Sequence, residues 1–149
     1  MRVLLAIDDS RYSEAAIQEL ATTVHAKGTQ ALIVRVLEPL LHTVIPKMEP
    51  AYTAEMAAQL EDERKLADEI IANAADLLRR AGFEVDTRVV ENEVRTAILD
   101  IAADWHADLI VIGSHSRKGV NRFLLGSVAD SVIRHAKCSV WVVRVRQPG

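Results

Sequence analysis

The segment "GSHSRKGVNRFLLGS" (residues 113–127) is rich in the residue types that proteins use to bind phosphate groups. Gly113 can take a positive φ and let a ligand approach the backbone. A helix is expected to begin at Gly126-Ser127, and the unpaired amides of a helix's first turn favour an anion. The Ser127 hydroxyl can cap that helix or donate to a phosphate. Basic side chains lie between these ends, among them His115, Arg117 and Lys118.

The same residues also fit a plain strand-to-helix connection with a normal helix cap and a solvated basic loop. The segment alone leaves both interpretations open. The fold decides between the two interpretations. A phosphate site requires that the flanking strand and helix bring residues 113 and 127 close to each other and to other polar side chains.

A second polar site follows the apolar run at residues 2–7, where Asp8 and Asp9 come next. Two such acids could hold Mg²⁺ beside a phosphoacceptor Asp, as in a receiver domain. That Asp should end the third strand, where this chain reads "VVEN" (89–92), and the required Lys after the fifth strand is absent. We therefore set the receiver interpretation aside and read Asp9 as an acid that the dipole of the following helix favours.

Apolar runs and helical periodicity predict an alternation of strands and helices along the whole chain. Strands are expected at 2–7, 31–37, 83–90, 109–113 and 139–145, and helices at 13–26, 53–81, 94–105 and 127–136. Residues 38–52 contain three prolines and are expected to form a long loop. Such alternation predicts a doubly wound α/β fold: one parallel sheet with right-handed crossovers and helices on both faces. Ligands of such sheets bind beyond the carboxyl ends of the strands.

Length and composition limit the classes of protein. A chain of 149 residues is one domain (1–149) by length. Its net charge of -3 gives no basic field for nucleic acid or a membrane surface. No apolar stretch reaches the roughly 18 residues of a spanning helix, no secretory signal is visible, and a single Cys138 excludes an internal disulfide framework. We expect a cytoplasmic protein.

Catalytic and metal-binding patterns are weak in this sequence. The five histidines have no close metal-ligand spacing with Cys or acidic residues. Serines near the candidate site have no identifiable paired His and acid. Catalysis would have to depend on positioning and on Mg²⁺ carried in by a nucleotide, which supports slow hydrolysis at most. Whether the chain is an enzyme stays open.

Four stretches of the chain resemble the universal stress protein family: "VLLAIDDS", "LIVRVLE", "VVENEVRTAIL" and "ADLIVIGSHSRKGVNRFLLGSVADSVIRHAKCSVWVV". The last is the most specific. In nucleotide-binding members it reads G-x-x-G, nine residues, then G-[S/T]. Here the frame is Gly113, Ser116 and Gly126-Ser127, so the spacing matches and Ser116 replaces one glycine.

The resemblance implies a sheet of strand order 3-2-1-4-5 with ATP in the crevice between the first and fourth strands. By the match, Asp8 would accept hydrogen bonds from the adenosine. The other residues expected around the nucleotide are Ala6, Ile7 and Val36 for adenosine, Ile112 and Gly113 near the ribose and phosphates, and Ser116, Arg117, Gly126, Ser127 and Val128 around the phosphate chain. The family commonly forms homodimers through the fifth strand, here 139–145.

Two departures bear on nucleotide binding. Ser116 carries a Cβ, which costs roughly 1 kcal/mol if its position needs a positive φ. Glu91 and Glu93 stand where many relatives read "EGxP", and they would repel phosphates if they faced the site. We therefore carry an ATP-binding, homodimeric stress-response module as the first hypothesis. The alternatives are a nucleotide-free interaction module, its pocket closed by Ser116 and the acidic turn, and a weak ATP hydrolase.

Overall fold

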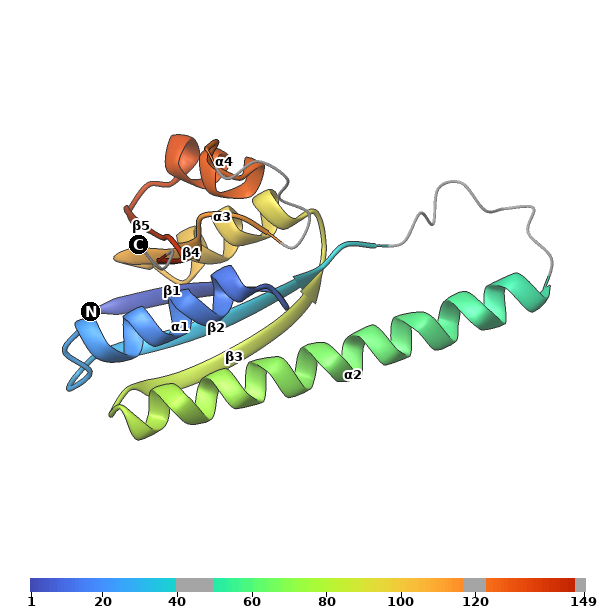
Figure 1. Cartoon of the computed structure of the whole chain (residues 1–149), viewed down its shortest axis with the longest axis horizontal. Helices are drawn as coiled ribbons and strands as arrows, with labels where there is room; N and C mark the ends of the chain where they lie inside the picture. The colour runs from blue at the N-terminus through green and yellow to red at the C-terminus, as the bar shows by residue number, and fades with distance from the viewer. Residues whose placement is uncertain (40–49, 117–122, 147–149) are drawn as a thin grey trace.

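The chain folds around a five-stranded parallel sheet of order β3-β2-β1-β4-β5 (Figure 1). The computed structural model describes residues 1–39, 50–116 and 123–146, and for residues 50–53 the backbone alone. The strands are β1 (Arg2–Ile7), β2 (Gln30–Leu37), β3 (Glu84–Glu91), β4 (Leu109–Gly113) and β5 (Ser139–Val143). The helices are α1 (Arg11–Thr23), α2 (Pro50–Arg80), α3 (Val94–Asp104) and α4 (Ser127–His135). This confirms the predicted fold class and strand order.

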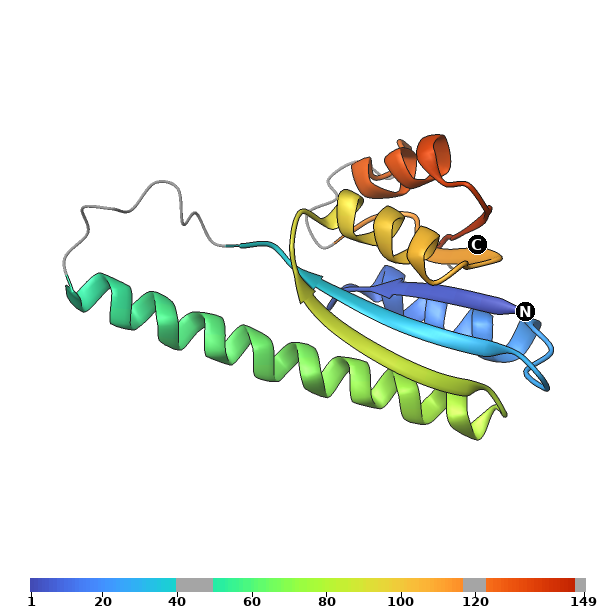
Figure 2. The ribbon, with the colours of Figure 1, turned by 180° about the vertical axis from the view of Figure 1, so that it is seen from behind.

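Two apolar cores lie on opposite faces of the sheet, because successive strand residues point to opposite sides. Leu5 and Ile33 pack with α1 and α2, whereas Leu4 and Leu32 pack with α3 and α4. Figure 2 shows the same layers from behind. Burial on both faces explains why β1 and β2 read as continuous apolar runs rather than alternating ones.

Helix α2 begins at Pro50, earlier than the predicted start at residue 53. Proline fits the first turn of a helix, where its missing N–H costs no hydrogen bond. The N-terminal part of α2 extends past the sheet (Figures 1 and 2). At its other end Gly82 has a φ of +102°, which confirms the predicted stop. Most of the loop predicted at 38–52 falls on residues 40–49, outside the described residues.

The carboxyl ends of the three central strands are level with one another. Ala6 of β1 pairs with Val34 of β2 on one side and with Ile112 of β4 on the other. The loops that leave these strands therefore start from the same edge of the sheet. Since α1 and α4 cover opposite faces, the chain diverges at this edge between β1 and β4, where α/β sheets bind ligands.

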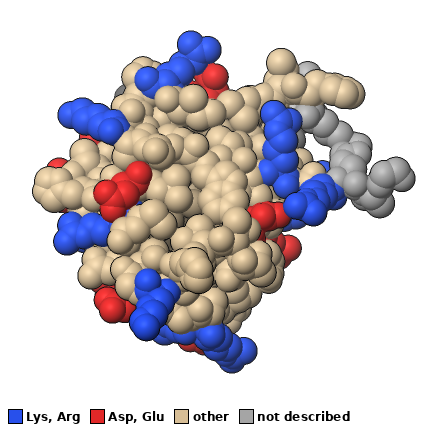
Figure 3. All heavy atoms as spheres, turned by 90° about the vertical axis from the view of Figure 1, so that its left-hand side faces the viewer, with Lys and Arg blue, Asp and Glu red and all other residues tan. Residues whose placement is uncertain are grey.

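Surface charge is mixed on the face shown in Figure 3, where basic and acidic side chains surround an uncharged centre. This distribution matches the small net charge of -3. Such a face presents no field of one sign to a charged partner. Among the described residues, no helix is both long enough and apolar enough to cross a membrane.

Candidate functional site

A cavity opens at the carboxyl edge of β1, β2 and β4, with about 530 Å³ of open space including its mouth. Nine of the residues expected from the sequence line it: Ala6, Ile7, Asp8, Val36, Ile112, Gly113, Ser116, Gly126 and Val128. The structure thus brings together residues that lie up to 122 positions apart in the chain (6 to 128).

Two expected residues are not among those that line the cavity. Ser127 is exposed, and Arg117 lies outside the described residues. Seven further residues line the cavity: Ser13, Val34, Arg35, Val94, Ile98, His115 and Ala129. Of these, His115 was noted from the sequence as a basic residue of the segment. Strand alternation could have added Val34, which points to the same face as Val36. Arg35 had a signal of its own, a cation inside an apolar run.

Hydrogen bonds hold the loop between β1 and α1 in place, and Asp8 is at their centre. Its Oδ1 accepts from the Ser10 amide at 2.9 Å and from the Ser13 hydroxyl at 2.8 Å. The Ser13 oxygen in turn accepts from the Asp8 amide at 2.8 Å. Ser10 is the N-cap of α1, and its hydroxyl accepts from the Ser13 amide. These bonds fix the Asp8 carboxylate at the cavity wall.

Gly113 is required by close packing rather than by its φ. The sequence allowed a positive φ at this position, but among the described glycines only Gly28 and Gly82 have one. A Cβ at Gly113 would lie 2.8 Å from the Tyr12 Cβ and 2.9 Å from the Tyr12 carbonyl carbon. Glycine therefore lets the first turn of α1 pack directly on the end of β4.

Gly126 plays a similar role where α4 begins. A Cβ there would lie 2.8 Å from the Ser114 carbonyl oxygen and 3.0 Å from the His115 Cα. The Gly126 amide donates to the Ser114 carbonyl oxygen at 2.8 Å, which ties the start of α4 to the chain leaving β4. The two ends of the 113–127 segment thus meet.

The cap of α4 differs from the one predicted. Gly126, not Ser127, is the N-cap, and no side chain caps the helix among the described residues. The first α4 amide with a backbone partner there is that of Asp130, which donates to the Gly126 carbonyl oxygen. The amides of Ser127, Val128 and Ala129 have no hydrogen-bond partner among the described residues. Unpaired amides in the first turn of a helix attract anions.

Ser116 lines the cavity without backbone strain. Among the described residues His106 is the only non-glycine residue with a positive φ, so Ser116 does not incur the predicted αL cost. Its neighbour His115 contacts the Tyr12 ring, with centroids 5.0 Å apart. The His115 Nε2 bonds the Leu124 carbonyl oxygen, which can only accept, so the ring proton lies on Nε2. The His115 Nδ1 and the Ser114 hydroxyl share a hydrogen bond of 2.9 Å.

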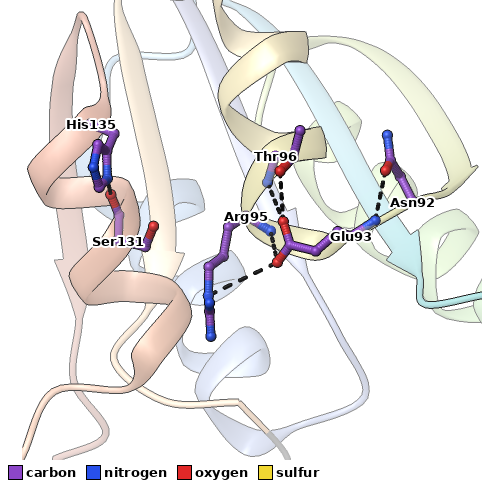
Figure 4. A network of polar contacts seen from close by, with 6 residues as sticks. All are labelled: Asn92, Glu93, Arg95, Thr96, Ser131 and His135. Carbon is purple, nitrogen blue, oxygen red and sulfur yellow. Dashed lines mark hydrogen bonds and ion pairs between the residues drawn. The ribbon is translucent and has the colours of Figure 1, made fainter.

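The two acids at the end of β3, Glu91 and Glu93, do not line the cavity. Glu91 pairs with Arg64 of α2 at 2.9 Å. Glu93 is the N-cap of α3, as Figure 4 shows: its Oε2 accepts from the Thr96 amide at 2.8 Å and from the Thr96 hydroxyl at 2.7 Å. These acids therefore do not close the cavity, which removes one of the two reasons for expecting a nucleotide-free module.

Glu93→Ala is expected to lower the free energy of unfolding by about 1 kcal/mol at pH 7, because a helix N-cap is lost. Hydrogen bonds from Thr96 hold the pKa of Glu93 below its ordinary value of 4.5, although slight burial opposes them. A lowered folded-state pKa means that this stabilisation is complete above pH 4.5 and is lost as the pH falls through the folded pKa. Urea unfolding at pH 7 and pH 3 measures both effects.

The matched control is Glu69→Ala, which removes an exposed carboxylate from α2. It is expected to change the unfolding free energy by less than about 0.5 kcal/mol. Equal losses for the two variants, or a Glu93→Ala loss as large at pH 3 as at pH 7, would contradict the capping role.

The described part of the chain has no group of three or more His, Cys, Asp or Glu side chains that could hold a metal ion. The cavity's polar groups are instead one carboxylate, two serine hydroxyls, one histidine, one arginine and the free amides at the start of α4. Apolar side chains make up the remaining wall. This combination suits an organic anion with an apolar portion.

The sequence model of the universal stress protein family matches residues 1–144. This chain belongs to the universal stress protein family. A protein of Staphylococcus epidermidis named for the same family is 29% identical over 147 residues, which cover 97% of this chain and 84% of that protein. UspA from Lactobacillus plantarum superposes with a TM-score of 0.81 at 21% identity and covers 97% of both chains.

Two other universal stress proteins of known structure share the fold. One, in complex with cAMP, has a TM-score of 0.70 at 24% identity over 96% of both chains. The other, from Archaeoglobus fulgidus and in complex with dAMP, has a TM-score of 0.63 at 24% identity over 96% of this chain and 97% of its own. These likenesses confirm the universal stress protein fold of this chain.

Proposed function

We propose that this chain binds ATP in the cavity between β1 and β4 and acts as a nucleotide-responsive regulatory module of the stress response. The observation that carries the proposal is the set of three unpartnered amides in the first turn of α4, beside a cavity whose other wall is apolar. The amides of a helix's first turn have no partner within the helix, and an anion would satisfy them. The nucleotide complexes of two family members support the same ligand class.

The phosphate chain would lie against the start of α4. There Gly126 keeps the backbone open, and the amides of Ser127, Val128 and Ala129 supply donors. The Ser116 hydroxyl borders the same space, and Arg117 would add charge from the adjoining segment. Exposure of the Ser127 side chain means that this residue contributes its backbone rather than its hydroxyl. Any Mg²⁺ would be carried by the nucleotide itself.

The adenosine would occupy the apolar part of the cavity. Ala6, Val36 and Ile112 from three adjacent strands, with Val34 and Ile98 beside them, offer flat apolar contacts for a base. Asp8 stands at the wall with its carboxylate held by Ser10 and Ser13, where it can accept from ribose hydroxyls. A single cavity thus has an apolar portion for the base and donors for the phosphates.

The direct test is thermal and chemical unfolding with and without ATP·Mg²⁺. Saturating ligand at 100 times its Kd is expected to add about 2.7 kcal/mol to the free energy of unfolding. Mass spectrometry of gently purified protein is expected to show a bound adenine nucleotide. No stabilisation at millimolar ATP, together with ligand-free mass spectra, would reject the proposal and favour a nucleotide-free interaction module.

We further propose that the chain is cytoplasmic and forms homodimers through β5. Among the described residues this strand pairs only with β4, which leaves its other edge for a strand of a second copy. Trp141 and Val143 pack on the α1 face of the chain's own sheet, which leaves the strand's backbone edge as the contact. Sedimentation velocity should report twice the chain mass of 16.5 kDa. A monomer at micromolar concentration would exclude this arrangement.

A further inference from the structure

Arg35 is an unusual residue for its position. It stands in β2 between Val34 and Val36, in a strand that is otherwise almost wholly apolar and buried. All three residues line the cavity. Burying a cation in such a strand costs free energy unless its donors form hydrogen bonds. An arginine at the cavity wall is therefore expected to have a hydrogen-bond acceptor as a partner.

The donors of Arg35 are poorly satisfied by the protein. Its Nη1 donates to the Val36 carbonyl oxygen at 3.3 Å, a long hydrogen bond, while its Nε is buried and has no hydrogen-bond partner among the described residues. No carboxylate pairs with it there, whereas five other arginines do have carboxylate partners: Arg64, Arg79, Arg95, Arg134 and Arg146. A buried unpaired donor on a charged group carries a full desolvation penalty.

Arg35 and the anion-binding amides lie on opposite sides of β1. The start of α4 is bonded to Ser114, directly after β4, and β1 separates β4 from β2. With neighbouring strands about 5 Å apart, β2 and β4 are roughly 10 Å from each other. A ligand whose phosphates meet α4 would therefore present its other end to β2.

We propose that Arg35 recognises the nucleobase by donating hydrogen bonds to acceptor atoms on its edge. This inference rests on the proposed function, because it assumes a nucleotide with its phosphates at α4. Purines carry in-plane ring nitrogens that accept hydrogen bonds, and the planar guanidinium matches such an edge. Val34, Val36 and Ile98 also line the cavity, and they offer apolar contacts to the base.

Isothermal titration calorimetry of ATP and of AMP with the wild-type protein and with Arg35→Met tests whether Arg35 contacts the base. Methionine keeps an unbranched apolar side chain as far as the position of Nε and removes every donor. The Kd of ATP is expected to rise about tenfold in Arg35→Met, the cost of a hydrogen bond to a charged group. The Kd of AMP should rise by the same factor, because ATP and AMP carry the same base. Arg35→Lys is expected to bind nearly as weakly, since an ammonium lacks the planar fork.

Arg88→Met is the matched control, because Arg88 is an exposed residue of the neighbouring strand β3 and is not among the residues that line the cavity. Its affinities should equal those of wild type. Without ligand, Arg35→Met should unfold at the same temperature as wild type or a higher one, because an unpaired buried donor has been removed. A marked loss of unliganded stability would instead indicate a structural role and overturn the inference.

The remaining outcomes are also decisive. If Arg35→Met lowers the affinity for ATP much more than the affinity for AMP, Arg35 contacts the phosphate chain and the inference is wrong. An unchanged affinity for both nucleotides overturns it as well. If wild type binds neither nucleotide, the proposed function itself has failed, and that failure is visible in the wild-type titration before any variant is compared.

Discussion

Gly126→Val is expected to abolish the stabilisation of this protein by ATP. A Cβ at Gly126 would lie 2.8 Å from the Ser114 carbonyl oxygen and 3.0 Å from the His115 Cα, and both are backbone atoms that have little freedom to move away. The start of α4 would therefore shift from β4, and the amides of its first turn would no longer border the cavity as they do now. Overpacking of this kind costs roughly 1–3 kcal/mol of folding stability as well.

The measurement for Gly126→Val is the midpoint of thermal unfolding with and without millimolar ATP·Mg²⁺. Wild type should shift, and the variant should unfold at one temperature in both conditions. Ser127→Val is the matched control: it adds the same β-branched side chain one residue later, at an exposed position that does not line the cavity. Its ATP shift should persist. A full ATP shift in Gly126→Val would show that the nucleotide does not use this helix start.

Asp8→Ala is expected to weaken ATP binding about a hundredfold and to destabilise the unliganded protein by roughly 1–3 kcal/mol. The two effects have different origins. The loss of stability follows because the Ser10 amide and the Ser13 hydroxyl both donate to Oδ1 of Asp8, and both serines are buried. The loss of affinity follows because the ribose would lose a charged acceptor and the loop that positions it.

Asp8→Asn separates these two effects. Asparagine keeps an oxygen in place of Oδ1 and can still accept from Ser10 and Ser13, so the unliganded stability should stay within about 0.5 kcal/mol of wild type. It loses the charge, and its ATP affinity should fall about tenfold, since ionised acceptors form hydrogen bonds roughly twice as strong. Urea unfolding and titration calorimetry provide the two readouts. Asn and Ala variants with equal ATP affinity would argue that the carboxylate does not contact the ligand.

Much of the fold could be predicted from the sequence because its signals are local. The apolar runs at 2–7 and 109–113 indicate strands buried on both faces, and each became a central strand with the predicted bounds. The strand-helix alternation required a parallel sheet, while the strand order came from the family resemblance. Helix ends were less secure: α2 begins at Pro50 and α4 is capped by Gly126 rather than Ser127. Their ends depend on contacts with other elements.

The candidate site shows the same division. Asp8 and the residues around Gly113 and Gly126 were predictable, because ligands gather where strands of a parallel sheet end. Sequence reasoning attributed Gly113 to a positive φ, whereas its actual constraint is the backbone of Tyr12. The predicted cost of Ser116 likewise depended on its φ angle, which the identity of one residue does not specify. Arg35 was missed because an isolated charge in a strand does not reveal which cavity it borders.

By itself, the sequence determined the order and type of the elements, and hence the edge of the sheet at which a ligand can bind. Only the tertiary structure decided which polar groups at that edge have no partner in the described part of the chain: the first amides of α4 and the Nε of Arg35. The physical reason is that periodicity and turn chemistry act between residues a few positions apart. Whether a donor is satisfied depends instead on groups that folding brings close from distant parts of the chain.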